Sequence, residues 1–239
     1  MIIQLYWTKI PDAIDMDKLQ TWLRILDDDE IGTYQKYRVS FKKVEFLIGR
    51  IMLKLYIANH TETPLHRIHF KKDVYGKLHF VDYNLKARKQ AMYFSLAHSS
   101  KVVVCSFTTQ CEIGVDVECV ETEHFSIMPM VFTQDEISFV NTKQSPNEKN
   151  FNFYLIWTRK EAYLKAVGKG FHISPLSFSV PQEMGVVCRG PWEFNTFFRD
   201  NYIISTACQK NQFQETIYQM HKIDFHDLLD CKISNILSQ

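Results

Sequence analysis

The sequence predicts a mixed α+β fold, and three segments carry that prediction. Residues 157–165, Trp-Thr-Arg-Lys-Glu-Ala-Tyr-Leu-Lys, are rich in helix-forming side chains, and Gly168 and Gly170 behind them favour a helix end. Residues 113–118 alternate β-branched side chains with others, which is typical of a strand. Residues 1–9 are apolar and predict a second strand. The chain therefore combines helices and strands.

The remaining elements follow in chain order. In the first part, we expect a helix over 16–26, a helical region over 30–58 and strands over 66–70, 77–81, 93–96 and 101–108. After the strand at 113–118, we expect a helix over 135–141 and strands over 173–180, 192–198 and 202–208. Residues 83–90 predict a polar loop. The C-terminal residues 213–239 are ambiguous between a strand that begins at Tyr218 and a helix over 226–237.

Composition excludes several classes of protein. With 239 residues, 46% of them hydrophobic, the chain can bury a sizeable core. A net charge of +1 gives no electrostatic basis for nucleic-acid binding. We expect no transmembrane helix and no signal peptide, because no apolar run approaches 18 residues and residues 1–10 lack a basic start. Six cysteines without a C-x-x-C pair predict reduced thiols in a cytoplasmic protein.

An acid and a base share one face of the predicted helix at 157–165. Glu161 and Lys165 are four residues apart and lie on the same stripe as Trp157 and Leu164. A surface ion pair at this spacing would stabilise the helix by roughly 0.2–0.5 kcal/mol. The alternative is a functional pair that faces a site.

Two carboxylates point to one face of the strand at 113–118. Asp116 and Glu118 are two residues apart, so their side chains lie on the same side and repel each other. A divalent cation would remove that conflict, since Mg²⁺ commonly takes one or two protein carboxylates together with water and phosphate oxygens. A solvent-facing strand edge is the ordinary alternative.

Together these two motifs resemble the signature of the Sfp-type 4′-phosphopantetheinyl transferases. Gly-Val-Asp-Val-Glu at 114–118 is followed about forty residues later by Trp-x-x-Lys-Glu-Ala-x-x-Lys at 157–165. The upstream segments Tyr-Gly-Lys at 75–77 and Phe-Ser-Leu-Ala-His-Ser at 94–99 resemble further family segments in the same order. The match runs from about residue 38 to residue 180.

The resemblance implies an enzyme that moves 4′-phosphopantetheine from coenzyme A to a serine of an acyl or peptidyl carrier protein and releases 3′,5′-ADP. It implies Mg²⁺, or Mn²⁺, bound by Asp116, Glu118 and Glu161, with Glu161 and Lys165 as the catalytic residues. It also implies two similar α+β halves related by a pseudo-twofold axis, with the active site between them. We place the halves at 1–110, for the nucleotide, and 111–239, for the metal and the carrier.

The resemblance implies that the nucleotide and its phosphates are bound by Arg50, Lys72, Lys77 and His98. The ordinary alternatives are that Arg50 lies at the rim of the core, that Lys72 and Lys77 belong to a solvated turn, and that His98 is simply hydrogen-bonded. Ser95 and Ala97 stand where the family usually has asparagine and serine, and Thr33 and Gln35 replace basic residues. We expect Ala97 to leave the 3′-phosphate of coenzyme A with one hydrogen-bond donor fewer.

Other functions remain open at this point. A Mg²⁺-dependent phosphohydrolase could use the same carboxylates, and a non-catalytic carrier-binding module could keep the fold. Most apolar residues of 119–132 predict core, but we expect exposed members such as Phe125 and Met128 to bind the carrier. We expect a monomer.

Overall fold

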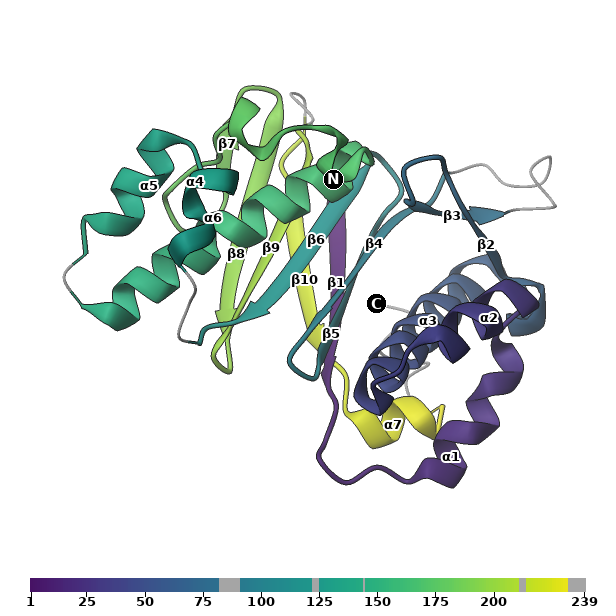
Figure 1. Cartoon of the computed structure of the whole chain (residues 1–239). Coiled ribbons are helices and arrows are strands. Elements are labelled where there is room, and N and C mark those ends of the chain that lie inside the picture. The colour runs from purple at the N-terminus through teal and green to yellow at the C-terminus, as the bar shows by residue number, and fades with distance from the viewer. Residues whose placement is uncertain (82–90, 122–124, 144, 211–213, 232–239) are drawn as a thin grey trace.

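The computed structural model describes residues 1–81, 91–121, 125–143, 145–210 and 214–231, and it confirms the α+β class (Figure 1). Within those residues, the strands form two four-stranded sheets and one hairpin. The first sheet has the order β10 (Ile217–Lys222), β1 (Ile2–Lys9), β5 (Val102–Thr108), β4 (Tyr93–Ser99). The second has the order β6 (Ile113–Cys119), β9 (Tyr202–Gln209), β8 (Trp192–Arg199), β7 (Val187–Arg189). The hairpin pairs β2 (His69–Lys72) with β3 (Leu78–Val81).

Strand β1 lies inside the first sheet and has an apolar cluster on each side. It runs antiparallel to β5 and parallel to β10. Because strand side chains alternate, Ile3 and Leu5 enter one cluster while Tyr6 enters the other. Six of its eight residues are buried, which explains why the sequence of this strand is apolar almost throughout.

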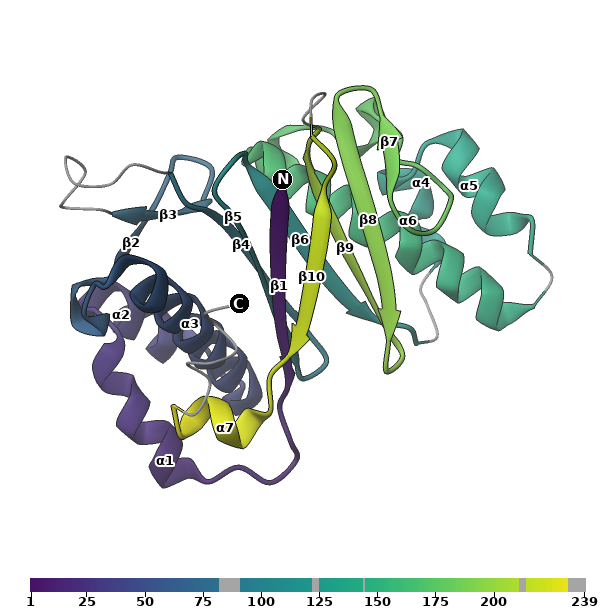
Figure 2. The ribbon, with the colours of Figure 1, turned by 180° about the vertical axis from the view of Figure 1, so that it is seen from behind.

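Four helices pack with the cluster that contains Tyr6, on the side of the first sheet opposite the second half (Figures 1 and 2). They are α1 (Met16–Thr21), α2 (Asp28–Lys36), α3 (Ser40–Thr61) and α7 (Phe225–Leu229). Helix α2 begins at a capping box, in which Asp27 and Glu30 each accept a hydrogen bond from the other's backbone N–H. The expected core residues Phe46, Leu47 and Ile51 of α3 are buried.

The second sheet is covered by α6 (Pro146–Val167), with α4 (Met128–Val131) and α5 (Gln134–Asn141) beside it. Helix α6 begins with Pro146 in its first turn and ends at Gly168, whose φ of 77° is left-handed. It packs closely on β6, and a Cβ atom at Gly114 would lie 1.9 Å from the backbone oxygen of Ala162. Glycine at position 114 therefore permits the close approach of the strand segment 113–118 to the helix segment 157–165.

A buried lysine–glutamate pair recurs in both halves. Lys54 Nζ lies 2.7 Å from Glu30 Oε2, and Lys160 Nζ lies 2.9 Å from Glu136 Oε2. Each lysine lies 14 positions after the first residue of a 22-residue helix, and each glutamate belongs to the capping box of the preceding helix. This likeness supports two similar halves.

The two halves are interleaved at the C-terminal end of the chain. We expected them to divide at residue 110, with 111–239 as one unit. The structure instead adds β10 to the first sheet and packs α7 into the first helical cluster. Strand β10 pairs in parallel with β1, so residues from beyond position 110 complete the first sheet.

Some expected elements differ from the structure. Residues 173–180 form no strand, because a 3₁₀ turn at Pro175–Ser177 occupies the segment. The strand expected at 66–70 begins only at His69, after a 3₁₀ turn at Leu65–Arg67. The loop expected at 83–90, and the end of the helix expected at 226–237, lie outside the described residues. In the part of the chain that the structure describes, no helix has the length and apolar character needed to cross a membrane.

Candidate active site

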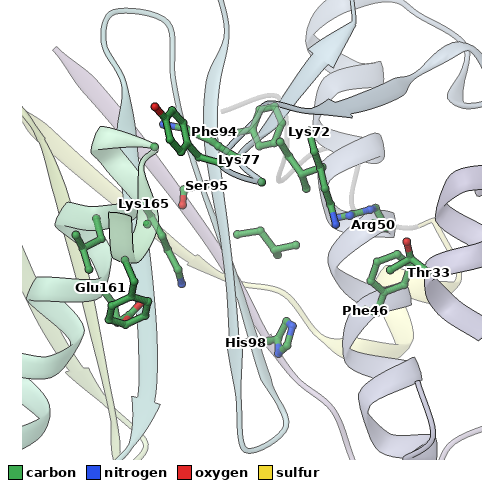
Figure 3. Close-up of a pocket in the computed structure, with 18 of the residues that line it drawn as sticks. Thr33, Phe46, Arg50, Lys72, Lys77, Phe94, Ser95, His98, Glu161 and Lys165 are labelled. Carbon is green, nitrogen blue, oxygen red and sulfur yellow. The ribbon is translucent and has the colours of Figure 1, made fainter. Parts of the chain in front are cut away.

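A cleft of about 340 Å³ lies where the hairpin, α2, α3 and β4 meet the C-terminal end of α6 (Figure 3). All the residues assigned to catalysis and nucleotide binding line it, namely Arg50, Lys72, Lys77, His98, Glu161 and Lys165. The sequence separates these residues by up to 115 positions, from Arg50 to Lys165. The fold therefore assembles one polar site from distant motifs.

Helix α6 divides its charged residues between the core and the cleft. Arg159 is buried and donates to Thr196 Oγ1 and to the backbone oxygen of Pro181, each at 2.8 Å. Burial lowers the pKa of Arg159 to about 10. Lys160 is buried beside Glu136, whereas Glu161 and Lys165 remain half-buried and line the cleft. Arg159 and Lys160 thus fix α6 to the core, whereas Glu161 and Lys165 line the cleft.

Lys165 reaches across to β6. Its Nζ atom lies 2.7 Å from Asp116 Oδ1 and 3.1 Å from the backbone oxygen of Val115. Asp116 is 6% exposed, and its other carboxylate oxygen, Oδ2, is buried without a hydrogen-bond partner among the described residues. The alternative of a surface pair between Glu161 and Lys165 is therefore not what the structure shows.

Glu118 is held by two neighbours and does not line the cleft. Its carboxylate accepts a hydrogen bond from Ser99 Oγ at the end of β4 and another from the side chain of Trp157 on α6. Ser99 belongs to the segment 94–99, so this contact joins three of the four sequence motifs. The sequence did not identify Ser99 or Trp157 as partners of Glu118.

The pKa values of all three carboxyl groups are raised. Burial is the largest cause for Asp116, Glu118 and Glu161 alike. The negative charge of Asp116 adds to the effect at the other two, and the pKa of Glu161 rises to about 7. Lys165 opposes the rise but does not cancel it. Three carboxyl groups near a single lysine carry excess negative charge when they are ionised, and burial makes that ionisation costly.

These carboxylates do not form a preformed metal cage. Among the described residues, no three His, Cys, Asp or Glu side chains are grouped to hold a metal ion. Lys165 Nζ contacts one oxygen of Asp116, and Ser99 Oγ donates a hydrogen bond to Glu118, so the assignment of a metal to Asp116, Glu118 and Glu161 stays a prediction. Mg²⁺ needs only one or two protein carboxylates when phosphate supplies other ligands. The buried, unpaired Oδ2 of Asp116 and the excess negative charge fit such an ion.

Arg50 lies on the opposite wall, at the level of Thr33 (Figure 3). Its Nε atom forms a 2.8 Å ion pair with Glu30 Oε1, and its guanidinium lies 4.6 Å from the ring centre of Phe46. Glu30 therefore orients Arg50 from behind, a role that the capping-box spacing of Asp27 and Glu30 did not reveal. Arg50 is buried, yet it is a lining residue of the cleft.

His98 lines the cleft at the far end of β4 and is backed by Glu45. The Nδ1 atom of His98 lies 3.1 Å from Glu45 Oε2, which also accepts from Lys42 Nζ at 2.7 Å. Burial alone would raise the pKa of Glu45, but the hydrogen bonds from His98 and Lys42 outweigh it and lower the pKa. Glu45 is thus a charged support for His98 that the sequence pattern did not indicate.

The structure differs from the sequence-based expectations at Ala97 and at Met128. Ala97 is 3% exposed and packs in the apolar cluster with Val115 and Val117, on the face of β4 opposite His98. Its lack of a hydroxyl is therefore a packing feature and not a missing phosphate contact. Met128, expected to be exposed, is buried, whereas Met130 is 72% exposed.

Residues 112–207 match the family model described as the 4′-phosphopantetheinyl transferase superfamily. The chain is 27% identical over 177 residues to 4′-phosphopantetheinyl transferase gsp of Aneurinibacillus migulanus, which covers 74% of this chain and 70% of that protein.

Two further relatives align over shorter stretches. The chain is 28% identical over 134 residues to 4′-phosphopantetheinyl transferase Sfp of Bacillus subtilis (strain 168), which covers 56% of each chain. It is 26% identical over 148 residues to putative 4′-phosphopantetheinyl transferase slr0495 of Synechocystis sp., covering 61% of this chain and 58% of that protein. The chain thus spans little more than half the length of these two relatives.

Proposed function

We propose that this chain is a member of the 4′-phosphopantetheinyl transferase superfamily and that it transfers the 4′-phosphopantetheine group of coenzyme A to a serine of an acyl or peptidyl carrier protein. The observation that carries the proposal is one cleft with Arg50, Lys72 and His98 on one side and Glu161 and Lys165 on the other, where Lys165 also contacts Asp116 outside the cleft lining. Such a cleft suits a diphosphate whose charge must be neutralised during transfer.

The reaction breaks one P–O bond and forms another. The serine oxygen attacks the phosphorus that carries the pantetheine arm, the bond from that phosphorus to the bridging oxygen breaks, and 3′,5′-ADP leaves. Glu161 is our candidate for the serine proton, because a carboxyl with a pKa of about 7 can accept protons near neutral pH. Lys165 would neutralise charge on the phosphate oxygens from its position beside Asp116.

The carboxylates would also hold a metal ion. We assign Mg²⁺, or Mn²⁺ in its place, to Asp116, Glu118 and Glu161, where it would draw charge from the diphosphate oxygens. Asp116 is the strongest candidate, because its Oδ2 has a buried open acceptor position. Lys165 then orients the carboxylate by holding Oδ1.

Coenzyme A would lie along the opposite wall. Arg50, Lys72, Lys77 and His98 would bind its phosphates and nucleotide, with Glu30 and Glu45 orienting Arg50 and His98. We further propose a monomer in the cytoplasm, where the six free cysteines would stay reduced.

The test is product analysis with purified protein, coenzyme A, Mg²⁺ and apo carrier proteins. We expect 3′,5′-ADP to appear only when carrier is present, in equal amount to the modified carrier. Phosphate release without carrier would instead indicate a phosphohydrolase. Carrier binding without any product would indicate a non-catalytic binding module.

A further inference from the structure

Lys77 is tied to the second half of the molecule by two hydrogen bonds. It lies where the hairpin enters β3, and its Nζ atom is 2.5 Å from Glu112 Oε2 and 3.0 Å from the backbone oxygen of Ala166. Glu112 directly precedes β6, and Ala166 belongs to the last turn of α6. One side chain thus joins the hairpin to both catalytic motifs.

The contact leaves little room for the lysine to move. A Cβ atom at Gly168 would lie 2.9 Å from Lys77 Cδ, so the glycine that ends α6 also makes space for the lysine stem. Only 13% of the Lys77 side chain is exposed. The Tyr75 ring meets the His172 ring at 5.1 Å beside it, which adds a second contact between the hairpin and the segment after α6.

One of the three N–H groups of the Lys77 ammonium donates to neither of these two acceptors. A lysine ammonium has three N–H donors, and the two described bonds use two of them. Because Lys77 also lines the cleft with Arg50, Lys72 and Lys165, the remaining donor is available to an anion there. A long flexible side chain that is fixed in advance loses less entropy when it binds a ligand.

We propose that Glu112 is a positioning residue, which holds the Lys77 ammonium against the end of α6 and thereby aims it at a phosphate of the substrate. The inference rests on the proposed function, because it assigns coenzyme A to the cleft. Glu112 itself does not line the cleft. Its effect on the substrate must therefore pass through Lys77.

A double-mutant cycle on coenzyme A binding tests this inference. Calorimetric titration with coenzyme A would compare wild type, Glu112→Ala, Lys77→Ala and the double variant at fixed salt. We expect Glu112→Ala to raise the Kd by about threefold to tenfold, within the usual range of coupling between contacting residues. The same change should add nothing once Lys77 is alanine. Glu112→Gln, whose amide oxygen still accepts from Lys77, should stay within about twofold of wild type.

Asp200→Ala is the matched control, because Asp200 forms a similar ion pair with Lys222 away from the cleft. It should leave the Kd unchanged. An unchanged or lower Kd for Glu112→Ala, or a full additional loss in the Lys77→Ala background, would overturn the positioning role alone. Failure of the wild type to bind coenzyme A would overturn the proposed function and this inference with it. Because 44% of the Glu112 side chain is exposed, we expect every variant at this position to fold.

Discussion

Lys165 Nζ lies 2.7 Å from Asp116 Oδ1, so this lysine links α6 to β6 and does not pair with Glu161 one turn before it. The strand motif and the helix motif are therefore parts of one electrostatic unit. Burial is the main cause of the raised pKa of Glu161, and the negative charge of Asp116 adds to it, while Lys165 opposes the rise without cancelling it. This arrangement places a carboxyl group with a raised pKa one helical turn from a fixed cation.

Replacing Lys165 by alanine should reduce turnover more than it weakens binding. The lysine acts where phosphate charge redistributes in the transition state, so we expect kcat to fall by about 10²-fold with a smaller change in KM. Steady-state kinetics with coenzyme A as the varied substrate would measure both values. Lys169→Ala, an exposed lysine just beyond α6, is the control and should behave as wild type. A change in KM alone would show that Lys165 serves only in binding.

Glu161→Gln keeps the shape of the side chain and removes its ability to accept the serine proton. We expect kcat to fall at least about 10²-fold, which is the scale of losing a general base. Glu148→Gln, on the exposed first turn of the same helix, should have no effect. If Glu161→Gln turns over within a few-fold of wild type, the base is another group.

Glu161 should also make the protein without metal less stable as pH rises. Its pKa is about 7 in the fold and 4.5 when unperturbed, so between these values the folded state binds more protons than the unfolded state. The free energy of unfolding therefore falls as pH increases from 4.5 to above 7. Glu161→Gln should raise Tm at pH 8 but not at pH 4. Thermal unfolding in chelator, with Glu148→Gln as the control, tests this, and an equal Tm at pH 8 would contradict it.

Ala97→Ser should destabilise the fold and leave coenzyme A affinity unchanged. The new hydroxyl would enter an apolar cluster, at a cost of about 1–3 kcal/mol if it finds no partner. Urea unfolding would measure the loss, and titration with coenzyme A would measure the affinity. Tighter coenzyme A binding by this variant would show that position 97 faces the nucleotide after all.

Met130 is the residue to test for carrier docking on the segment after β6. Met130→Ser should raise the KM for the carrier and spare that for coenzyme A, because Met130 is exposed and lies close in sequence to Asp116. Met128→Ser is the contrast, since Met128 is buried and its loss should lower Tm. Equal KM values for Met130→Ser and wild type would remove this residue from the docking surface.

The sequence predicted which residues form the site better than which other side chains hold those residues in place. Spacing alone placed Asp116 and Glu118 on one strand face and Glu161 and Lys165 on one helix face, and the resemblance added Arg50, Lys72, Lys77 and His98. The partners of these residues come from distant segments, and no local period shows that Glu30 supports Arg50 or that Glu112 holds Lys77. Long-range pairs of this kind depend on the packing of the two halves.

The boundaries of helices and strands also depend in part on contacts that a local sequence pattern does not show. Helix α6 ends at Gly168 as predicted but begins at Pro146, eleven residues before the predicted segment 157–165, and the helical region predicted over 30–58 is divided into α2 and α3. The strand predicted over 173–180 does not form, because Pro175 breaks the apolar alternation there and favours a turn. The place of β10 beside β1 could not be predicted, because it depends on a parallel pairing of the two ends of the chain.

The most direct test of the proposed function is the intact mass of a carrier protein after incubation with this protein, coenzyme A and Mg²⁺. A panel of apo acyl and peptidyl carriers should include at least one that gains the mass of a single phosphopantetheine group. The gain should disappear in chelator, with Glu161→Gln, and with a carrier whose acceptor serine is replaced by alanine. No mass gain on any carrier by a folded protein that binds coenzyme A would contradict the proposed transfer.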